Sequence, residues 1–159
     1  MRILIKSLSE DGSYPEYLAY VESIKDKLPA AAYEYAKAEW HYSITDPRGI
    51  HDAWLQSVTI SGVFGADQCP ERCNIEAKFL NAFCDQLLSF EYKSVVSYDL
   101  QSPSPFQAHP EVYFDEIRIS EQANVIHEIL FMSNVHWLIE CKEFSLKHEV
   151  LAPGAVQSA

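Results

Sequence analysis

A histidine beside an aspartate, His51-Asp52, is the first feature of this sequence that could do chemistry; it lies in the segment ITDPRGIHDAWL, residues 44–55. A histidine and a carboxylate in one cleft can act together as general acid and base, and both residue types also bind metal ions. The later segments FDEIRIS and VIHEILF add further acids and a second histidine. The catalytic candidates are therefore His51, Asp52, Asp115, Glu128 and His127.

Spacing argues against a metal or a cofactor at these residues. The sequence holds no HExxH or HxH motif. Neighbouring side chains of an extended segment point in opposite directions, so His51 and Asp52 are poorly placed to share one ion. The segment CPERC spaces its cysteines more widely than the usual zinc knuckle, and the other two cysteines form no second pair. We expect no metal site and no cofactor.

Motifs for nucleophilic or phosphate chemistry are also missing. The chain has only five glycines and contains neither a G-x-S-x-G elbow nor a glycine-rich phosphate loop. An enzyme built on the candidates above would be a small hydrolase or a metal-assisted enzyme. It would require His51 to lie within hydrogen-bond or one-water reach of Asp115 or Glu128.

Two short helices are expected to precede the strands that carry these residues. The segment SYPE, Ser13 to Glu16, resembles a capping box. Apolar residues follow at helical spacing: Tyr14, Tyr17, Leu18, Val21, Ile24 and Leu28. Pro29 should end this helix and begin a second one in PAAAYEYAKAEW, with Tyr33, Ala36 and Trp40 on one face. The opening MRILIKSL predicts a short strand or an extended arm.

After the turn TDPRG the sequence becomes β-like. Six segments rich in Val, Ile, Phe and Tyr are separated by short polar turns: 54–63, 73–80, 87–100, 111–119, 124–133 and 135–146. Connections this short cannot hold crossover helices, which favours an antiparallel sheet. The predicted fold class is α+β, two N-terminal helices packed on a mostly antiparallel sheet of about six strands. We expect a single domain over residues 1–150 and a flexible C-terminal tail over 151–159.

The last three strands have turns short enough to predict a register. If SEQA joins the first two strands and a two-residue SN turn joins the next, Glu116 lies opposite His127 and His127 lies opposite Glu140. That row is most simply a ladder of ion pairs on a solvated face. Asp115 and Glu128 then point to the apolar face, where they need donors such as His51. A change of one residue in the first loop would dissolve both rows.

The segment ITDPRGIHDAWL is expected to join the helices to the sheet. Its Asp-Pro pair makes a turn, and Ile50, Trp54 and Leu55 fill the gap between the two layers. The His51-Asp52 pair then satisfies loop amides or the inward acids, with a functional role as the alternative.

Charge and composition restrict the partners. The formal net charge is −11, from 23 acidic and 12 basic residues. Such a chain repels phosphate backbones and anionic lipid, so we expect no nucleic acid and no membrane partner, whereas a basic protein partner fits. The absence of a signal peptide and of a transmembrane run predicts a cytoplasmic protein with four reduced cysteines. The binding candidates are Trp40, His41, Glu116, Glu140 and Trp137.

Parts of the chain resemble a family of small uncharacterised bacterial proteins. The segment LPAAAYEYAKAEWHYSITDPRGIHDAWLQSVTI, with FDEIRIS, VIHEILF and WLIECKEFSL, is similar to their W-H-Y, H-D-x-W-L, D-E-[IVF]-R and H-E-I-x-F patterns, over roughly residues 28–147. The chain departs from the pattern at LNAFCD, where the family has Gly and His. The matching residues are Trp40, His41, His51, Asp52, Trp54, Leu55, Tyr98, Asp115, Glu116, His127, Glu128 and Trp137.

A more distant resemblance is to immunity-type proteins found beside polymorphic toxins, some of which begin their sheet with H-D-x-x-L. Neither resemblance implies a catalytic residue. We therefore expect a non-enzymatic, cytoplasmic protein-binding module, immunity-like and directed at a basic partner. The alternatives are the enzyme described above and a homodimeric scaffold.

Overall fold

The structure, a computed structural model, describes residues 14–103 and 109–153. Two helices precede a six-stranded antiparallel sheet of order β1-β2-β3-β6-β5-β4, which confirms the predicted α+β class. The predicted arm at residues 1–8, the capping Ser13 and the tail beyond residue 153 lie outside the described residues. The elements are α1 (Pro15–Ser23), η2 (Lys25–Lys27), α2 (Ala30–Lys37), η3 (Glu39–Tyr42), β1 (Trp54–Phe64), β2 (Pro70–Leu80), β3 (Gln86–Leu100), β4 (Val112–Ile119), β5 (Val125–Phe131), η4 (Met132–Asn134) and β6 (His136–Val150).

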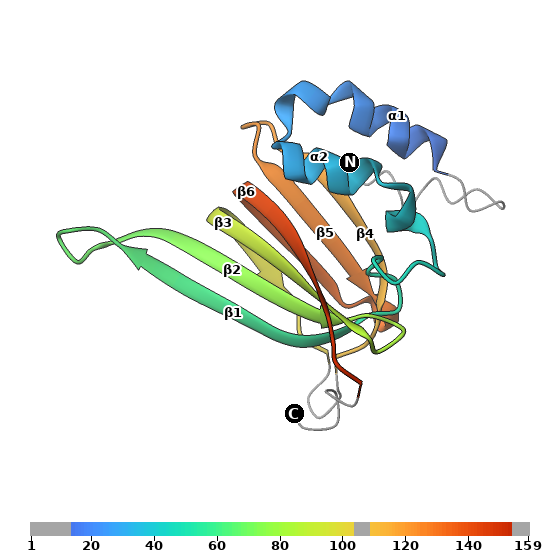
Figure 1. Ribbon diagram of the computed structural model, residues 1–159. Helices are drawn as coiled ribbons and strands as arrows, with labels where there is room; N and C mark the ends of the chain where they lie inside the picture. Colours follow the sequence, from blue (N-terminus) through green and yellow to red (C-terminus); the bar gives the residue numbers. More distant parts are fainter. Residues whose placement is uncertain (1–13, 104–108, 154–159) are drawn as a thin grey trace.

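The sheet is strongly curved, and both helices lie together on one side of it (Figure 1). The ring centroids of Phe79 on β2 and Phe131 on β5 are only 6.2 Å apart, although β3 and β6 separate the two strands in the sheet. That distance requires a concave face, on which side chains from distant strands meet. The β1–β2 hairpin extends away from this body as a long arm (Figure 1).

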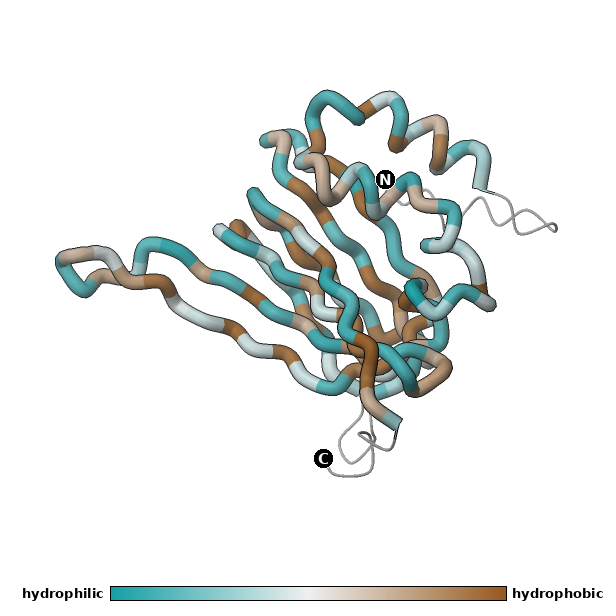
Figure 2. Tube along the Cα trace, viewed as in Figure 1, coloured by the Kyte–Doolittle hydropathy of each residue, from teal (hydrophilic) through white to brown (hydrophobic). Residues whose placement is uncertain are grey.

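The hydrophobic core fills the concave face. Apolar residues recur along the strands between polar ones (Figure 2), as the alternation of a half-buried sheet requires. The strands supply large, fully buried side chains, among them Phe79, Phe90, Phe131 and Ile139. Each contributes about 1.5–3 kcal/mol through burial, so the aromatic-rich sequence accounts for a core built on a sheet.

A proline lies at or directly before the start of each helix. α1 starts at Pro15, at the first helical position where proline loses no hydrogen bond, and α2 starts directly after Pro29. Tyr17 and Val21 are buried, but Leu18 is 42 % exposed, so the apolar stripe of α1 is narrower than predicted. Among the described residues, no helix is long and apolar enough to cross a lipid bilayer.

The predicted register of β4, β5 and β6 is wrong by one residue at both turns. His127 lies opposite Ile117 and Ile139, not opposite the two glutamates. Each turn holds a non-glycine residue in the left-handed region, Ala123 with φ 62° and Asn134 with φ 60°. The chain therefore needs a longer turn at each place than the sequence pattern indicates.

A shift of one residue turns every side chain of β5 to the other face. His127 consequently points into the concave core beside Asp115, as their hydrogen bond shows. Glu128 points to the convex face and lies opposite Glu116. The predicted inward direction of Asp115 is correct, that of Glu128 is wrong, and the ladder of Glu116, His127 and Glu140 does not form.

Helix α1 covers the edge of the sheet at β4. The Tyr17 hydroxyl accepts a hydrogen bond from the Ile117 amide (2.8 Å) and donates one to the Ile117 carbonyl (3.0 Å). The Tyr20 hydroxyl accepts from the Ile119 amide at 3.1 Å. These two tyrosines occupy backbone groups that would otherwise be open to pairing with another strand.

Candidate functional site

The carboxylate of Asp115 joins the helices to the sheet. Tyr35 of α2 donates to its Oδ2 (2.7 Å), and His127 of β5 bonds the same oxygen through Nε2 (2.9 Å). His41 of η3 bonds Oδ1 through Nε2 at 2.8 Å. Asp115 is only 6 % exposed, so these three side chains replace the hydrogen bonds from water that the carboxylate loses on burial.

The network fixes where its protons lie. Burial opposes ionisation of Asp115, but the charge of His41 and the hydrogen bonds from His127 and His41 outweigh it, and the pKa of Asp115 lies well below its ordinary value. An ionised carboxylate only accepts, so both imidazoles carry a proton on Nε2. The second nitrogen of His127 pairs with the Tyr92 hydroxyl at 2.7 Å. Burial raises the pKa of Tyr92, so its hydroxyl stays protonated and is the partner of this buried nitrogen.

His41 is held between two phenol rings. Its ring centroid lies 4.1 Å from that of Tyr35 and 4.3 Å from that of Tyr42, and both pairs are stacked within 30°. Its second nitrogen, Nδ1, is buried and has no hydrogen-bond partner among the described residues. Stacking and the bond to Asp115 therefore fix this imidazole, rather than a second hydrogen bond.

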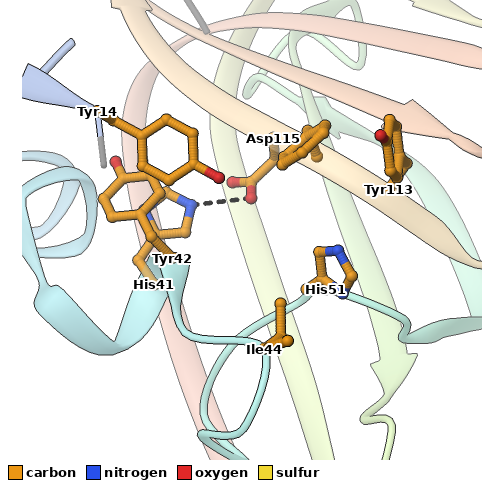
Figure 3. Close-up of a pocket in the computed structure, with 8 residues that line it drawn as sticks. Tyr14, His41, Tyr42, Ile44, His51, Tyr113 and Asp115 are labelled. Atoms are coloured by element: carbon orange, nitrogen blue, oxygen red, sulfur yellow. Dashed lines mark hydrogen bonds and ion pairs between the residues drawn. The ribbon is translucent and has the colours of Figure 1, made fainter. Parts of the chain in front are cut away.

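A cavity of about 90 Å³ opens beside Asp115. Figure 3 shows the carboxylate between Tyr14, Tyr42 and His41 on one side and Tyr113 on the other, with His51 below. The lining residues are Tyr14, His41, Tyr42, Ile44, His51, Tyr113, Phe114 and Asp115.

Aromatic rings form most of the cavity wall. The ring centroids of Tyr14 and Tyr42 are 5.0 Å apart, and those of Tyr14 and Phe114 are 6.5 Å apart. Phe114 continues to Tyr113 at 4.2 Å and to His51 at 6.0 Å. The rings thus make a continuous band around one buried carboxylate.

The cavity occupies a gap in the covering of the β4 edge. At one end of the strand, the Val112 amide donates to the Ala53 carbonyl and the Asp52 amide donates to the Val112 carbonyl, both at 2.9 Å. At the other end, Tyr17 holds Ile117. Asp115 lies between these points, two residues before Ile117. Because the backbone groups of successive residues point alternately to the two sides of a strand, the amide and carbonyl of Asp115 face outward like those of Ile117, at the cavity.

The five catalytic candidates do not converge. His51 and Asp115 line the same cavity, whereas His127 lies behind Asp115 and is fully buried. The Asp52 carboxylate lies 3.0 Å from His51 Nδ1, but its side chain is half exposed and outside the cavity. Glu128 lies on the opposite face of the sheet, so no site can combine all five.

Three of the acids predicted as site residues lie on the convex face. The Arg118 Nε atom is 2.7 Å from Glu116, and the Arg118 guanidinium also bonds Glu128. His136 bonds Glu128 at 2.6 Å, and Glu140 accepts from Asn124. These contacts make Glu116 and Glu128 parts of a largely buried ion cluster rather than a binding surface.

The tryptophans and the start of the sheet serve mainly in packing. Trp137 is buried and donates from Nε1 to the Gln101 carbonyl, and Trp40 is partly buried under the Arg48 guanidinium. Ile50 is 1 % exposed, as expected of a residue that fills the joint. Trp54 is 37 % exposed, so its predicted role in filling that joint is wrong.

Sequence reasoning missed the tyrosines of this site. It treated Tyr14 as an apolar helix residue, considered Tyr113 only as a possible donor to the inward acids, and did not single out Tyr35, Tyr42 or Tyr92. The available signal was the count of nine tyrosines. A buried tyrosine needs a partner for its hydroxyl, and an inward acid supplies one.

No metal site is present in the part of the chain that the structure describes: no three His, Cys, Asp or Glu residues are arranged to hold an ion, and the four cysteines are free thiols. No family model, curated protein or solved structure matches the chain. The two family resemblances therefore stay predictions from the motifs.

Proposed function

We propose that this protein is a non-enzymatic, immunity-like binding module that pairs strand β1 with an extended segment of a basic protein. The observation that carries the proposal is the open edge of β1. This strand has 11 residues, forms one rim of the sheet and, within residues 14–103 and 109–153, pairs with β2 alone. A partner strand added there would gain main-chain hydrogen bonds along its length.

The composition of β1 lacks the charges and prolines that often protect an edge strand, and irregular pairing with β2 is confined to Leu55/Ser57 and Val63/Phe64 near its two ends. Its sequence, WLQSVTISGVF, contains no charged residue and no proline, the residues that commonly prevent edge pairing. Val58, Ile60 and Phe64 are 37 %, 47 % and 64 % exposed. These side chains supply the apolar contacts that a bound strand would cover.

The other rim of the sheet, strand β4, is covered by helix and loop residues, so the open edge is particular to β1. Tyr17, Tyr20 and Ala53 occupy outward backbone groups of β4. Both rims face the same selection against aggregation. A rim that stays open on a projecting arm is best explained by a partner.

Charge favours a basic partner. The net charge of −11 gives the whole molecule a negative field, which steers cationic proteins towards it. The arm itself carries Asp67, Glu71 and Glu76 against Arg72 and Lys78. The enzyme alternative has less support, because Glu128 lies across the sheet and His127 is fully buried behind Asp115, so the candidate residues do not share one cleft.

The test compares capture by the wild type, Ile60→Lys and Val96→Lys from a lysate of the source organism, followed by reconstitution with the purified partner. Ile60→Lys places a charge on the open edge, whereas Val96 is similarly exposed, at 52 %, on β3. We expect a basic protein that binds the wild type and Val96→Lys, is lost with Ile60→Lys, and weakens with salt. Hydrogen exchange of the reconstituted complex should show new protection over residues 54–64.

Two results would contradict the proposal. One is protection that maps away from β1 in the reconstituted complex, or equal binding by Ile60→Lys. The other is a dimer of the chain alone, seen by light scattering and broken by Ile60→Lys, since the occupant of the edge would then be a second copy.

A further inference from the structure

We propose that the cavity beside Asp115 binds a small organic ammonium group. This goes beyond the proposed function, and it concerns β4, the rim of the sheet opposite β1. The two proposals can therefore fail independently.

The lining of the cavity contains one group that can attract a cation, the Asp115 carboxylate, and the charge of His41 in the same lining offsets part of that attraction. Among the described residues that line it there is no lysine or arginine, and its one carboxylate is Asp115. Each carboxylate oxygen can accept two hydrogen bonds, and from the residues that the structure describes Oδ1 accepts one, from His41. One acceptor position thus remains for a ligand, in a site where low polarity strengthens the attraction between charges.

The aromatic band suits an ammonium group better than other cations. Tyr14, Tyr42, Tyr113 and Phe114 line the cavity together with Asp115, and the centroids of neighbouring rings are 4.2–6.5 Å apart. Rings in this arrangement bind the weakly hydrated methyl or methylene groups of an ammonium through cation–π contacts. A metal ion would need several oxygen ligands, and one carboxylate does not supply them.

The outward backbone of the edge strand adds a polar side to the cavity. The carbonyl of Asp115 faces the gap between the bonds at Val112 and Ile117, so it can accept from an N–H of a primary or partly methylated ammonium. The cavity volume of about 90 Å³ is well below the roughly 300–1,000 Å³ of drug-sized pockets. It therefore accepts a head group of a few heavy atoms.

The test is a titration followed by amide chemical shifts of the full chain. The probes are methylammonium and tetramethylammonium chlorides, with tert-butanol as the neutral analogue, sodium acetate as the anion and sodium chloride to match ionic strength. We expect saturable shifts at the amides of Tyr113 and Asp115 with the ammonium salts at millimolar concentrations, and none with acetate. Equal binding of tert-butanol, or binding of acetate, or no saturable shift with either ammonium salt, would overturn the assignment.

Variants separate the site from a general surface effect. Tyr113→Leu removes a ring that is 38 % exposed, so the fold should survive, and ammonium affinity should fall roughly 3- to 30-fold. Tyr98→Leu is the matched control, 48 % exposed on β3, and should bind as the wild type. An unchanged affinity in Tyr113→Leu would contradict the proposal. A peptide with one trimethyllysine shows where the ammonium group comes from. If the peptide binds tenfold tighter than tetramethylammonium, the ligand is a protein side chain, and if the two bind equally, the ligand is a free amine.

Discussion

Replacing Asp115 with asparagine should destabilise the protein by about 3 kcal/mol at neutral pH. The carboxylate accepts from Tyr35, His41 and His127 at 2.7–2.9 Å. The amide of asparagine keeps one acceptor oxygen, which can serve Tyr35 and His127 if its NH2 group takes the place of Oδ1. That NH2 then meets the N–H of His41, so one charge-assisted bond is lost and two become neutral.

The loss should depend on pH in a definite direction. The pKa of Asp115 is lowered in the folded state and is about 3.9 in an unfolded chain. Its contribution to the free energy of unfolding is therefore complete above about pH 4 and disappears as the pH falls towards the folded pKa. The difference between wild type and Asp115→Asn should be constant from neutral pH down to about pH 5 and shrink below about pH 4.

Urea unfolding, monitored by circular dichroism at several pH values, measures both quantities. The matched control is Asp46→Asn, which also removes a carboxylate of lowered pKa, in this case because of hydrogen bonds from Arg48. Asp46 is bound by Arg48 at the surface, so its removal should cost little because water screens the pair. A loss in Asp115→Asn no larger than that of the control, or one that stays constant to pH 2, would refute the account of the buried network.

Three further predictions concern the edge, the buried network and thiol reactivity. Tyr17→Phe removes the hydroxyl that bonds both backbone groups of Ile117, so the protein should lose about 1–3 kcal/mol and the Ile117 amide should exchange faster with deuterium; an unchanged exchange rate would contradict the capping role. Tyr92→Phe leaves the buried Nδ1 of His127 without its hydrogen-bond partner, and urea unfolding should show a loss of about 1–3 kcal/mol. An unchanged free energy of unfolding would contradict a stabilising role for this hydrogen bond. Burial raises the pKa of Cys141 to about 12, so a thiol reagent at pH 8 should modify the other three cysteines and leave Cys141 unmodified until denaturant is added. Mass spectrometry counts the modified thiols, and modification of Cys141 in the native protein would contradict the prediction.

Local sequence patterns were sufficient for the helices and strands because each element shows its own period. The predicted strands end within a few residues of the observed ones, from β1 at 54–64 to β6 at 136–150. Pro15 stands at the first helical position, where the geometry of proline is favourable, and Pro29 is the residue directly before α2. The largest difference is at the end of β6, which continues to Val150 and not to residue 146 as predicted. These last residues are mostly polar because they face solvent, so the sequence pattern does not mark them as a strand.

The candidate site was harder to predict because it depends on register. Turns that contain Ala123 and Asn134 with positive φ are one residue longer than the pattern suggests, and alanine gives no sequence signal for that conformation. The error exchanged His127 and Glu128 between the two faces. Asp115 was placed correctly, but the partners of its carboxylate come from α2, η3 and β5, and no spacing rule connects them.

The unequal treatment of the two rims has a consequence for stoichiometry. A sheet with two open rims can add a neighbour at each side and grow without limit. Here Tyr17, Tyr20 and Ala53 cover the rim at β4 on both sides of the gap at Asp115, which leaves too short an open stretch for a second strand, so pairing through β1 would end after one partner. If β1 pairs with a partner as proposed, the expected product is a discrete complex and not a fibre that grows through the same sheet.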